Sequence, residues 1–213
     1  VVLTTSNGGF AWEEQESPSD TTLYGLYVKD RSRLVVSGAR GVILTTNNGG
    51  NKWTLRPTGI RDHLFAVTFA PQNVLQGWAV GTFGSIIATV DGGRTWKQQE
   101  SKTRAHLFAV AFSSAKNGIA VGSHGTILIT ANGGAEWKPV KSLTDTALTG
   151  ITFTSRDEAQ AHPHLAQRLQ LLIGGARDRT PRQQTLRGAI DWSYDLLDAG
   201  HRQLFRRMAV FQG

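Results

Sequence analysis

Asp91 and four histidines are the side chains whose setting first suggests chemistry. Asp91 stands in VDGGRTW, where a carboxylate among glycines could act as a general acid or bind a metal ion. His63 and His106 each precede an apolar segment by one residue, and His162 and His164 form an H-x-H pair. No further ligand lies at the spacing typical of a zinc site. We therefore predict no metal site and no cofactor, and assign these histidines to turns, packing or a linker.

The composition limits the class of protein. The 213 residues include 24 Gly and 6 Trp but no Cys, and the formal net charge is +7. This is typical of turn-rich β structure without disulfide bonds. No apolar run approaches the roughly 18 residues that a membrane-spanning helix needs. The positive charge favours anionic partners but does not choose among acidic proteins, lipid head groups and nucleic acid.

A repeat marked by tryptophan contains most of these residues. Four similar segments, VLTTSNGGFAW, ILTTNNGGNKW, IIATVDGGRTW and ILITANGGAEW, end at Trp12, Trp53, Trp96 and Trp137. The intervals between these tryptophans are 41, 43 and 41 residues. Eleven residues after each of them, an apolar segment begins, at Leu23, Leu64, Leu107 and Leu148.

Each repeat is predicted to form four short strands. LFAVAF alternates with period 2, GIAVG is a short apolar run, TILIT is β-branched, and the fourth strand starts at the Trp. The two extra residues of the third repeat fall in APQNVLQGW, which we expect to be a loop. Four strands in about 40 residues are typical of a propeller blade.

The predicted fold is mainly β. It is a partial, open β-propeller of about three complete four-stranded blades, starting at Leu23, Leu64 and Leu107, with parts of other blades and an α-helical tail. An alternative is that residues 1–16 pair with the strand at Leu148 to form an imperfect fourth blade. We prefer the open form, whose free sheet edges offer a route to self-association.

The turn between the third and fourth strands carries a second pattern. Thr89, Asp91, Gly93 and Trp96 fit S/T-x-D-x-G-x-x-W, and Asn replaces Asp in the other three copies. A short Asp or Asn side chain can bond back to the turn backbone, Gly permits positive φ, and Trp packs across the hairpin. The pattern resembles the Asp-box, or bacterial neuraminidase repeat. We assign a structural role to Asn7, Gly9, Trp12, Asn48, Gly50, Trp53, Asp91, Gly93, Trp96, Asn132, Gly134 and Trp137.

Longer segments carry a family resemblance. VGTFGSIIATVDGGRTW and VGSHGTILITANGGAEW, with the rest of residues 1–154, resemble the photosystem II stability and assembly factors of plants and cyanobacteria. The resemblance implies a propeller that chaperones membrane-protein assembly without catalysis. Similar domains occur in non-photosynthetic bacteria, so it implies the module more firmly than the photosynthetic role. It also implies a periplasmic or lumenal location.

A partner-binding face is predicted from the topology of a blade. The loops that join strands two and three emerge on the same side as the loops that join successive blades. Arg offers a planar fork that suits carboxylates. We therefore predict contacts with an acidic protein segment at Arg40, Arg61, His63, Phe83, Arg104, His106 and His124. We give equal weight to the alternative that solvated charges simply collect in loops.

Asp-boxes also occur in sialidases, so an enzyme is a further possibility. Such enzymes need an arginine triad and a Tyr with a Glu partner, and glycosidases in general need two opposed carboxylates. The three tyrosines, Tyr24, Tyr27 and Tyr194, have no such neighbours in the sequence. We therefore predict that the chain is not an enzyme and has no small-molecule substrate.

The composition changes near Ser155. The first 154 residues contain seven Lys and seven Arg, whereas the remaining 59 contain nine Arg and no Lys. Helical periodicity follows, as in Leu186, Ile190, Tyr194 and Leu197. We predict three parts: a propeller fragment at 1–154, a linker and helix start at 155–167, and a helical fragment at 168–213.

The last part has a resemblance of its own. It is carried by Trp192, Ser193, Tyr194, Leu196, Leu197, Leu204, Phe205 and Arg206. The segment 168–213 resembles the junction between the helical and winged-helix parts of STAND-class signalling ATPases in bacterial transcriptional regulators, which implies a cytoplasmic relay. GGARDRT lacks the Lys followed by Ser or Thr of a phosphate-binding loop, so we predict no ATP hydrolysis.

Two functions follow from these resemblances. The first is a non-catalytic scaffold that binds a protein partner such as an acidic or membrane-protein segment. The second is a signalling regulator in which the propeller is a sensor and the tail a relay. The sequence completes no recognition helix, so we predict no nucleic-acid binding by this chain alone. The junction is either a genuine fusion of sensor and relay or a product of gene assembly.

Overall fold

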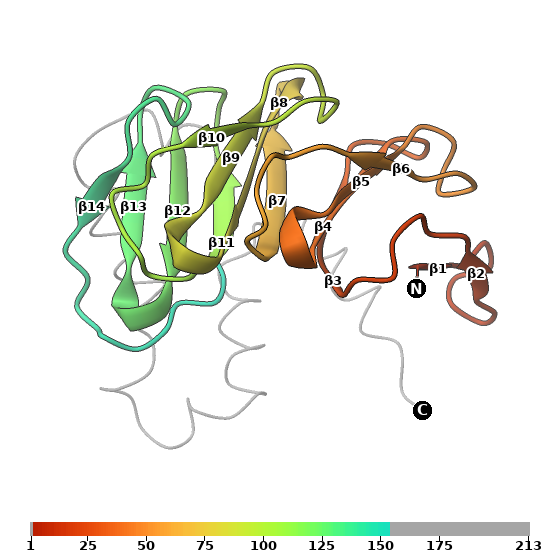
Figure 1. The fold of residues 1–213 in the computed structure, drawn as a ribbon, viewed down its shortest axis with the longest axis horizontal. Coiled ribbons are helices and arrows are strands. Elements are labelled where there is room, and N and C mark those ends of the chain that lie inside the picture. The colour runs from red at the N-terminus through yellow and green to blue at the C-terminus, as the bar shows by residue number, and fades with distance from the viewer. Residues whose placement is uncertain (1, 154–213) are drawn as a thin grey trace, which may run out of the picture. The chain divides into compact units, whose positions relative to one another are not determined.

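The computed structural model describes residues 2–153, which form a series of antiparallel sheets (Figure 1). Blade 1 contains β3 (Leu23–Val28), β4 (Leu34–Gly38), β5 (Ile43–Thr46) and β6 (Thr54–Arg56). Blade 2 contains β7 (Leu64–Ala70), β8 (Asn73–Gly81), β9 (Ile86–Thr89) and β10 (Lys97–Gln99). Blade 3 contains β11 (Leu107–Phe112), β12 (Gly118–Gly122), β13 (Ile127–Thr130) and β14 (Lys138–Val140). In each blade the strands pair in chain order, which confirms the predicted incomplete propeller with three complete four-stranded blades.

A fourth, smaller sheet precedes blade 1. Strands β1 (Val2–Thr4) and β2 (Glu13–Gln15) form a hairpin, and Val2 packs against the buried Val36, Leu44 and Trp53 of blade 1. Within residues 2–153, β1 and β2 pair only with each other. The alternative in which they complete a blade with the chain at Leu148 is therefore wrong for the described residues.

The burial of each strand follows from its place in the blade. Strand β12, the second strand of blade 3, is buried at every residue, and the last four residues of β4 and the last five of β8 are also buried, because each of these strands pairs with a strand on both sides. The fourth strands, β6, β10 and β14, expose their first two residues and are only three residues long. Short edge strands offer little unpaired backbone to another chain.

The core lies between the sheets. One cluster joins Trp78 of blade 2 to Phe112 and Trp137 of blade 3, and another joins Val35 of blade 1 to Phe69 of blade 2. The repeat therefore specifies stacking as well as strands, since each sheet buries its apolar face only against the next one.

Two sequence expectations need correction. Residues 148–153, the predicted first strand of a further blade, are not a strand, because a strand needs a hydrogen-bonded neighbour and no second strand of that blade lies within the described residues. The segment APQNVLQGW, expected to be a loop, lies mostly in strand β8. The pairing of β7 with β8 shifts register between Phe69 and Ala70, and this shift absorbs the extra residues.

Several predictions fall outside the described residues. These are the helical tail, the His162 and His164 pair, the part boundaries after residue 154 and the relay segment at 168–213. Among the residues described, no helix has the length and apolar character needed to cross a membrane.

Candidate partner-binding face

Three short turns place one exposed side chain each at the same end of the blades. They are η1 (Ala39–Gly41), η2 (Thr82–Gly84) and η3 (Ser123–Gly125), and each joins the second and third strands of its blade. The central residues, Arg40, Phe83 and His124, have φ values of 56, 54 and 55°. Left-handed backbone is uncommon for residues other than glycine. The repeat therefore holds three different, exposed side chains in one strained conformation.

His63 and His106 connect these turns across neighbouring blades. The backbone N–H of Arg40 donates to Nδ1 of His63 at 3.3 Å, and that of Phe83 donates to Nδ1 of His106 at 3.2 Å. The carbonyl of His63 in turn accepts from Thr82 N–H in its own blade at 2.9 Å. An accepting Nδ1 requires the proton to be on Nε2. Each imidazole thus fixes the turn of the preceding blade and keeps Nε2 as a donor.

Arg61 and Arg104 are exposed in the loops that lead into blades 2 and 3. Beside Arg61, the carbonyl of Asp62 accepts from Gly41 N–H at 2.7 Å, and its carboxylate accepts from the hydroxyl of Ser85. The loops are therefore neighbours of the turns, as predicted. The contacts between them run through backbone, histidine and Asp62, and no described contact joins the guanidinium groups of Arg40, Arg61 and Arg104.

An aromatic row, which sequence reasoning missed, lies beside these loops. Tyr24, Phe65 and Phe108 are the second residues of the LYGLYV, LFAVTF and LFAVAF segments, and the strand register shifts at each of them. Ring centroids are 5.3 Å apart for Tyr24 and Phe65, and 5.6 Å apart for Phe65 and Phe108. A β-bulge redirects the side chain that it carries. The recurrence of an aromatic residue at one repeat position was the available signal.

The histidines and Phe83 extend the aromatic row toward the turns. The ring of His63 lies 6.2 Å from that of Tyr24, and the ring of His106 lies 5.3 Å from that of Phe83. Phe83 is 65% exposed. The loop face, defined as the three turns, the loops with Arg61 and Arg104, and the aromatic row, therefore offers flat apolar rings beside donors that suit carboxylates.

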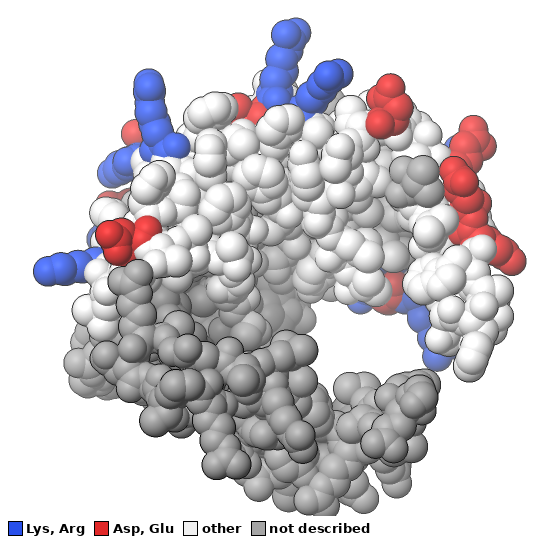
Figure 2. Space-filling model, turned by 90° about the horizontal axis from the view of Figure 1, so that it is seen from below, with Lys and Arg blue, Asp and Glu red and all other residues white. Residues whose placement is uncertain are grey.

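The charges on this molecule are dispersed. On the side seen in Figure 2, Lys and Arg side chains project mainly at the outer edge, and much of the surface between them is uncharged. Isolated cations in high dielectric attract weakly. A partner of the loop face would therefore need apolar contacts in addition to negative charge.

The four Asp-boxes share one hydrogen-bond pattern. In each, the first hydroxyl accepts from the second glycine, as in Gly93 N–H to Thr89 Oγ1 at 2.9 Å. The Asn or Asp Oδ1 accepts from the backbone N–H four residues later, for example from Lys52 to Asn48 and from Thr95 to Asp91, at 2.9 Å in both. Trp53, Trp96 and Trp137 are buried, whereas Trp12 is 59% exposed.

Asp91 makes more bonds than its Asn counterparts. It accepts from Arg94 N–H at 2.9 Å and from the Thr95 hydroxyl at 2.6 Å. Partial burial alone would raise the pKa of Asp91, but these bonds, with that from Thr89, outweigh it and lower the pKa to about 2. A carboxylate that stays ionised and fully bonded is a poor proton donor. Within residues 2–153 no group of three His, Cys, Asp or Glu could hold a metal ion.

Comparison with known proteins places this geometry in a family. A family model described as photosynthesis system II assembly factor YCF48 matches residues 4–100 and 94–173. The chain belongs to the YCF48 family. The matched residues include all three complete blades.

Solved structures of YCF48 proteins have a similar fold. YCF48 from Cyanidioschyzon merolae is 24% identical, with a TM-score of 0.53 over 61% of this chain and 42% of that one. YCF48 bound to a D1 peptide is 22% identical, with a TM-score of 0.51 over 57% of this chain and 41% of that one. The crystal structure of an ancestral GH74 enzyme is 17% identical, with a TM-score of 0.54 over 66% of this chain and 21% of that one. These likenesses establish the propeller fold alone.

A second similarity is short. HTH-type transcriptional regulators of Mycobacterium tuberculosis and Mycobacterium bovis are 56% identical to this chain over 43 residues. The match covers 20% of this chain and 5% of each regulator. The chain thus spans a small part of those regulators, and less than half of each solved YCF48 structure.

Proposed function

We propose that this YCF48-family chain is a non-catalytic scaffold whose loop face binds an extended protein segment. The observation that carries the proposal is the recurrence of an exposed, non-glycine side chain at the left-handed position of all three turns. Backbone strain of this kind is maintained by the surrounding structure and clusters at functional sites. The partner in the solved YCF48 complex is a D1 peptide, which supports a peptide as the class of ligand.

The proposed contacts divide into two types. Phe83 and the aromatic row contribute apolar area, which supplies most of the affinity in peptide recognition. Arg40, Arg61 and Arg104 select carboxylates and speed association. His63 and His106 position the turns and offer Nε2–H as an additional donor.

Charge reversal tests the loop face. The substitutions Arg40→Glu, Arg61→Glu and Arg104→Glu together should weaken binding of a D1 peptide by about tenfold or more, measured by fluorescence anisotropy. The matched control is Lys52→Glu, Lys97→Glu and Lys116→Glu, which makes the same change in net charge at exposed residues outside the loop face. If both triple variants bind the peptide as tightly as the unchanged protein, the loop face is not the binding surface.

The absence of catalysis is tested separately. The GH74 likeness concerns an enzyme with a propeller fold, so fluorogenic glycosides are the appropriate substrates. We expect no turnover above the uncatalysed rate. Turnover that survives purification to homogeneity would replace the scaffold proposal with an enzymatic one.

A second function is favoured by the short match to HTH-type regulators. In this proposal the propeller is a sensor and the segment 168–213 relays its occupancy to a regulatory module. Reading the uninterrupted genomic DNA across codons 145–170 tests it. A frameshift or a missing junction there would remove the sensor-and-relay function and leave the scaffold proposal intact.

A further inference from the structure

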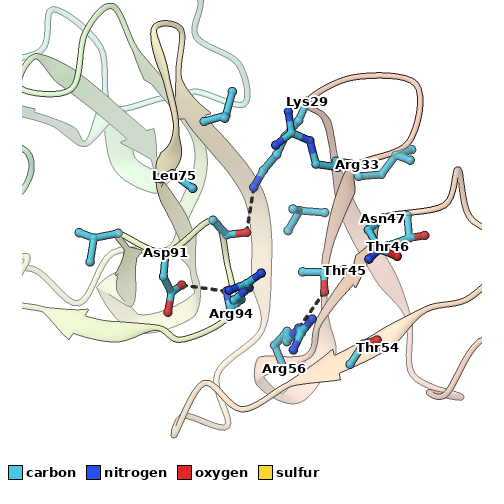
Figure 3. Close-up of a pocket in the computed structure, with 15 residues that line it drawn as sticks. Lys29, Arg33, Thr45, Thr46, Asn47, Thr54, Arg56, Leu75, Asp91 and Arg94 are labelled. Carbon is cyan, nitrogen blue, oxygen red and sulfur yellow. Dashed lines mark hydrogen bonds between the residues drawn. The ribbon is translucent and has the colours of Figure 1, made fainter.

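A cavity of about 470 Å³ lies between blades 1 and 2, near their Asp-box ends (Figure 3). Four cationic side chains line it, Lys29, Arg33 and Arg56 from blade 1 and its loops, and Arg94 from the third Asp-box. Asp91 is the acidic residue of the lining. Figure 3 shows Lys29, Arg56 and Arg94 extending into the space between the two sheets.

The equivalent space between blades 2 and 3 is filled. There the indole of Trp78 stacks on Phe112, with ring centroids 3.4 Å apart and planes 6° from parallel. Its Nε1 donates to the carbonyl of Gly133 at 2.9 Å. Trp78 lies three residues before Gly81, which ends β8. Val35 lies three residues before Gly38, which ends β4, so the two residues are equivalent in the repeat. The cavity exists because blade 1 has Val35 where blade 2 has an indole.

Lys29 partly replaces that indole. Its Nζ donates to the carbonyl of Gly92, the counterpart of Gly133, at 2.8 Å. The same Nζ lies 3.8 Å from the ring centroid of Phe69, the counterpart of Phe112. Burial lowers the pKa of Lys29 to about 8, and the charge of Arg33 contributes to the lowering. A half-buried ammonium in this position would gain from an anionic partner.

Arg56 and Arg94 also depart from the repeat. Arg56 stands three residues after Trp53, where the neighbouring repeats have Gln15 and Gln99. Arg94 stands two residues before Trp96, where the other boxes have Phe10, Asn51 and Ala135. The repeat fold therefore does not require a cation at either position. Nε of Arg56 donates to Thr45 at 2.8 Å, and within residues 2–153 neither arginine forms a salt bridge.

The charge balance suits a dianion. The four cations are opposed by Asp91 in the lining and by Asp30, which pairs with Arg33 at 2.6 Å, so four positive and two negative charges leave +2. Asp91 already accepts four hydrogen bonds within its box, so it does not neutralise the arginines directly.

We propose that the cavity between blades 1 and 2 is a binding site for a phosphate-class dianion, either free phosphate or a small phosphate monoester. Arg56, on strand β6 of blade 1, and Arg94, in the Asp-box turn of blade 2, approach from facing blades and would bind its oxygens through their terminal nitrogens. Lys29 would contribute a point charge from the side of Phe69. The site is distinct from the loop face and does not depend on the scaffold function.

The test replaces each arginine with a residue that the chain itself uses at an equivalent position. Arg56→Gln with Arg94→Ala should raise the Kd for inorganic phosphate about tenfold or more, measured by calorimetry and 31P NMR at constant ionic strength. The control, Arg31→Gln with Lys97→Gln, removes the same charge from exposed residues outside the cavity and should leave the Kd unchanged. Phenyl phosphate, titrated in parallel, distinguishes a monoester from the free ion.

A second variant fills the cavity. Val35→Trp with Lys29→Ala copies the arrangement between blades 2 and 3 and should abolish phosphate binding while the near-ultraviolet circular dichroism of a folded protein is retained. The proposal is overturned if phosphate fails to bind in the millimolar range, if the control variant loses binding as much as the arginine variant, or if a diglutamate peptide binds the cavity more tightly than either phosphate.

Discussion

Asp91 differs from Asn7, Asn48 and Asn132 mainly in its charge. All four side chains accept the backbone N–H four residues later, so the turn itself does not require a carboxylate. The charge adds bonds from Arg94 N–H and the Thr95 hydroxyl. The position of Asp91 among glycines therefore does not indicate a catalytic acid, because a hydrogen-bonded carboxylate with a low pKa remains ionised.

Substitution Asp91→Asn should change acid sensitivity. The pKa of Asp91 is about 2 in the folded protein against 3.8 ordinarily, so its contribution to stability is complete above pH 4 and is lost as the pH falls through 2. The Asn variant should lack this pH-dependent contribution. Urea unfolding at pH 7, pH 4 and pH 2.5 measures the effect. Parallel pH profiles for the two proteins would contradict the assignment.

Lys29 should add a second pH dependence of stability at alkaline pH, in which the charged form is the less stable one. Its pKa falls from 10.5 to about 8 on folding, so folding favours the neutral amine. Below pH 8 the charged ammonium lowers the free energy of unfolding, and this penalty is relieved as the pH rises from 8 to 10.5. Lys29→Met should reduce this rise in the free energy of unfolding, whereas Lys52→Met, at an exposed residue, should not. Unfolding by urea across this pH range distinguishes the two variants.

At the scale of elements, the three η turns combine strain with exposure. A left-handed residue with a side chain costs about 1–2 kcal/mol relative to its ordinary conformation. The backbone bonds to His63 and His106 help to maintain this conformation in η1 and η2. The turns therefore present their side chains at the expense of stability.

Glycine at these positions should stabilise the fold and weaken partner binding. Arg40→Gly and Phe83→Gly should each raise the free energy of unfolding by about 0.5–1 kcal/mol, because glycine adopts positive φ without strain. Arg40→Val should lower it, because a β-branched residue is strongly disfavoured there. Equilibrium unfolding provides the measurement, and a loss of stability in both glycine variants would indicate that the native side chains make favourable contacts.

At the scale of the whole molecule, stability depends on how each sheet meets the next. Trp78 illustrates this dependence, because its ring partner and its hydrogen-bond acceptor both belong to blade 3. The spaces between blades are not equivalent, although the blades repeat. The space between blades 2 and 3 is filled by the indole of Trp78, whereas the space between blades 1 and 2 is an open, cationic cavity.

Substitution Trp78→Val should open a cavity between blades 2 and 3 like the one between blades 1 and 2. It removes a fully buried indole, so the free energy of unfolding should fall by about 3 kcal/mol or more. Trp12→Val removes the same group from an exposed position and should cost less than about 1 kcal/mol. Thermal unfolding compares the two, and equal losses would mean that packing between blades does not determine stability.

The sequence alone determined the elements that depend on local chemistry. The tryptophan interval, the period-2 segments and the box glycines predicted three four-stranded blades, and the fourth strand was misplaced by one residue, since β6 begins at Thr54 and not at Trp53. Turn bonding and alternation act over a few residues and are therefore visible in the sequence. The residues proposed for partner contact and the parts after residue 154 remain predictions.

Only the tertiary structure decided which residues of neighbouring repeats are in contact. The bridging role of His63, the aromatic row and the cavity beside Lys29 each depend on contacts between residues of neighbouring blades that lie 23 or more positions apart in the sequence. Residues 148–153 repeat the strand pattern but form no strand among the described residues, because a strand depends on its neighbour. Periodicity specifies each blade, whereas the site between two blades depends on which side chains meet there.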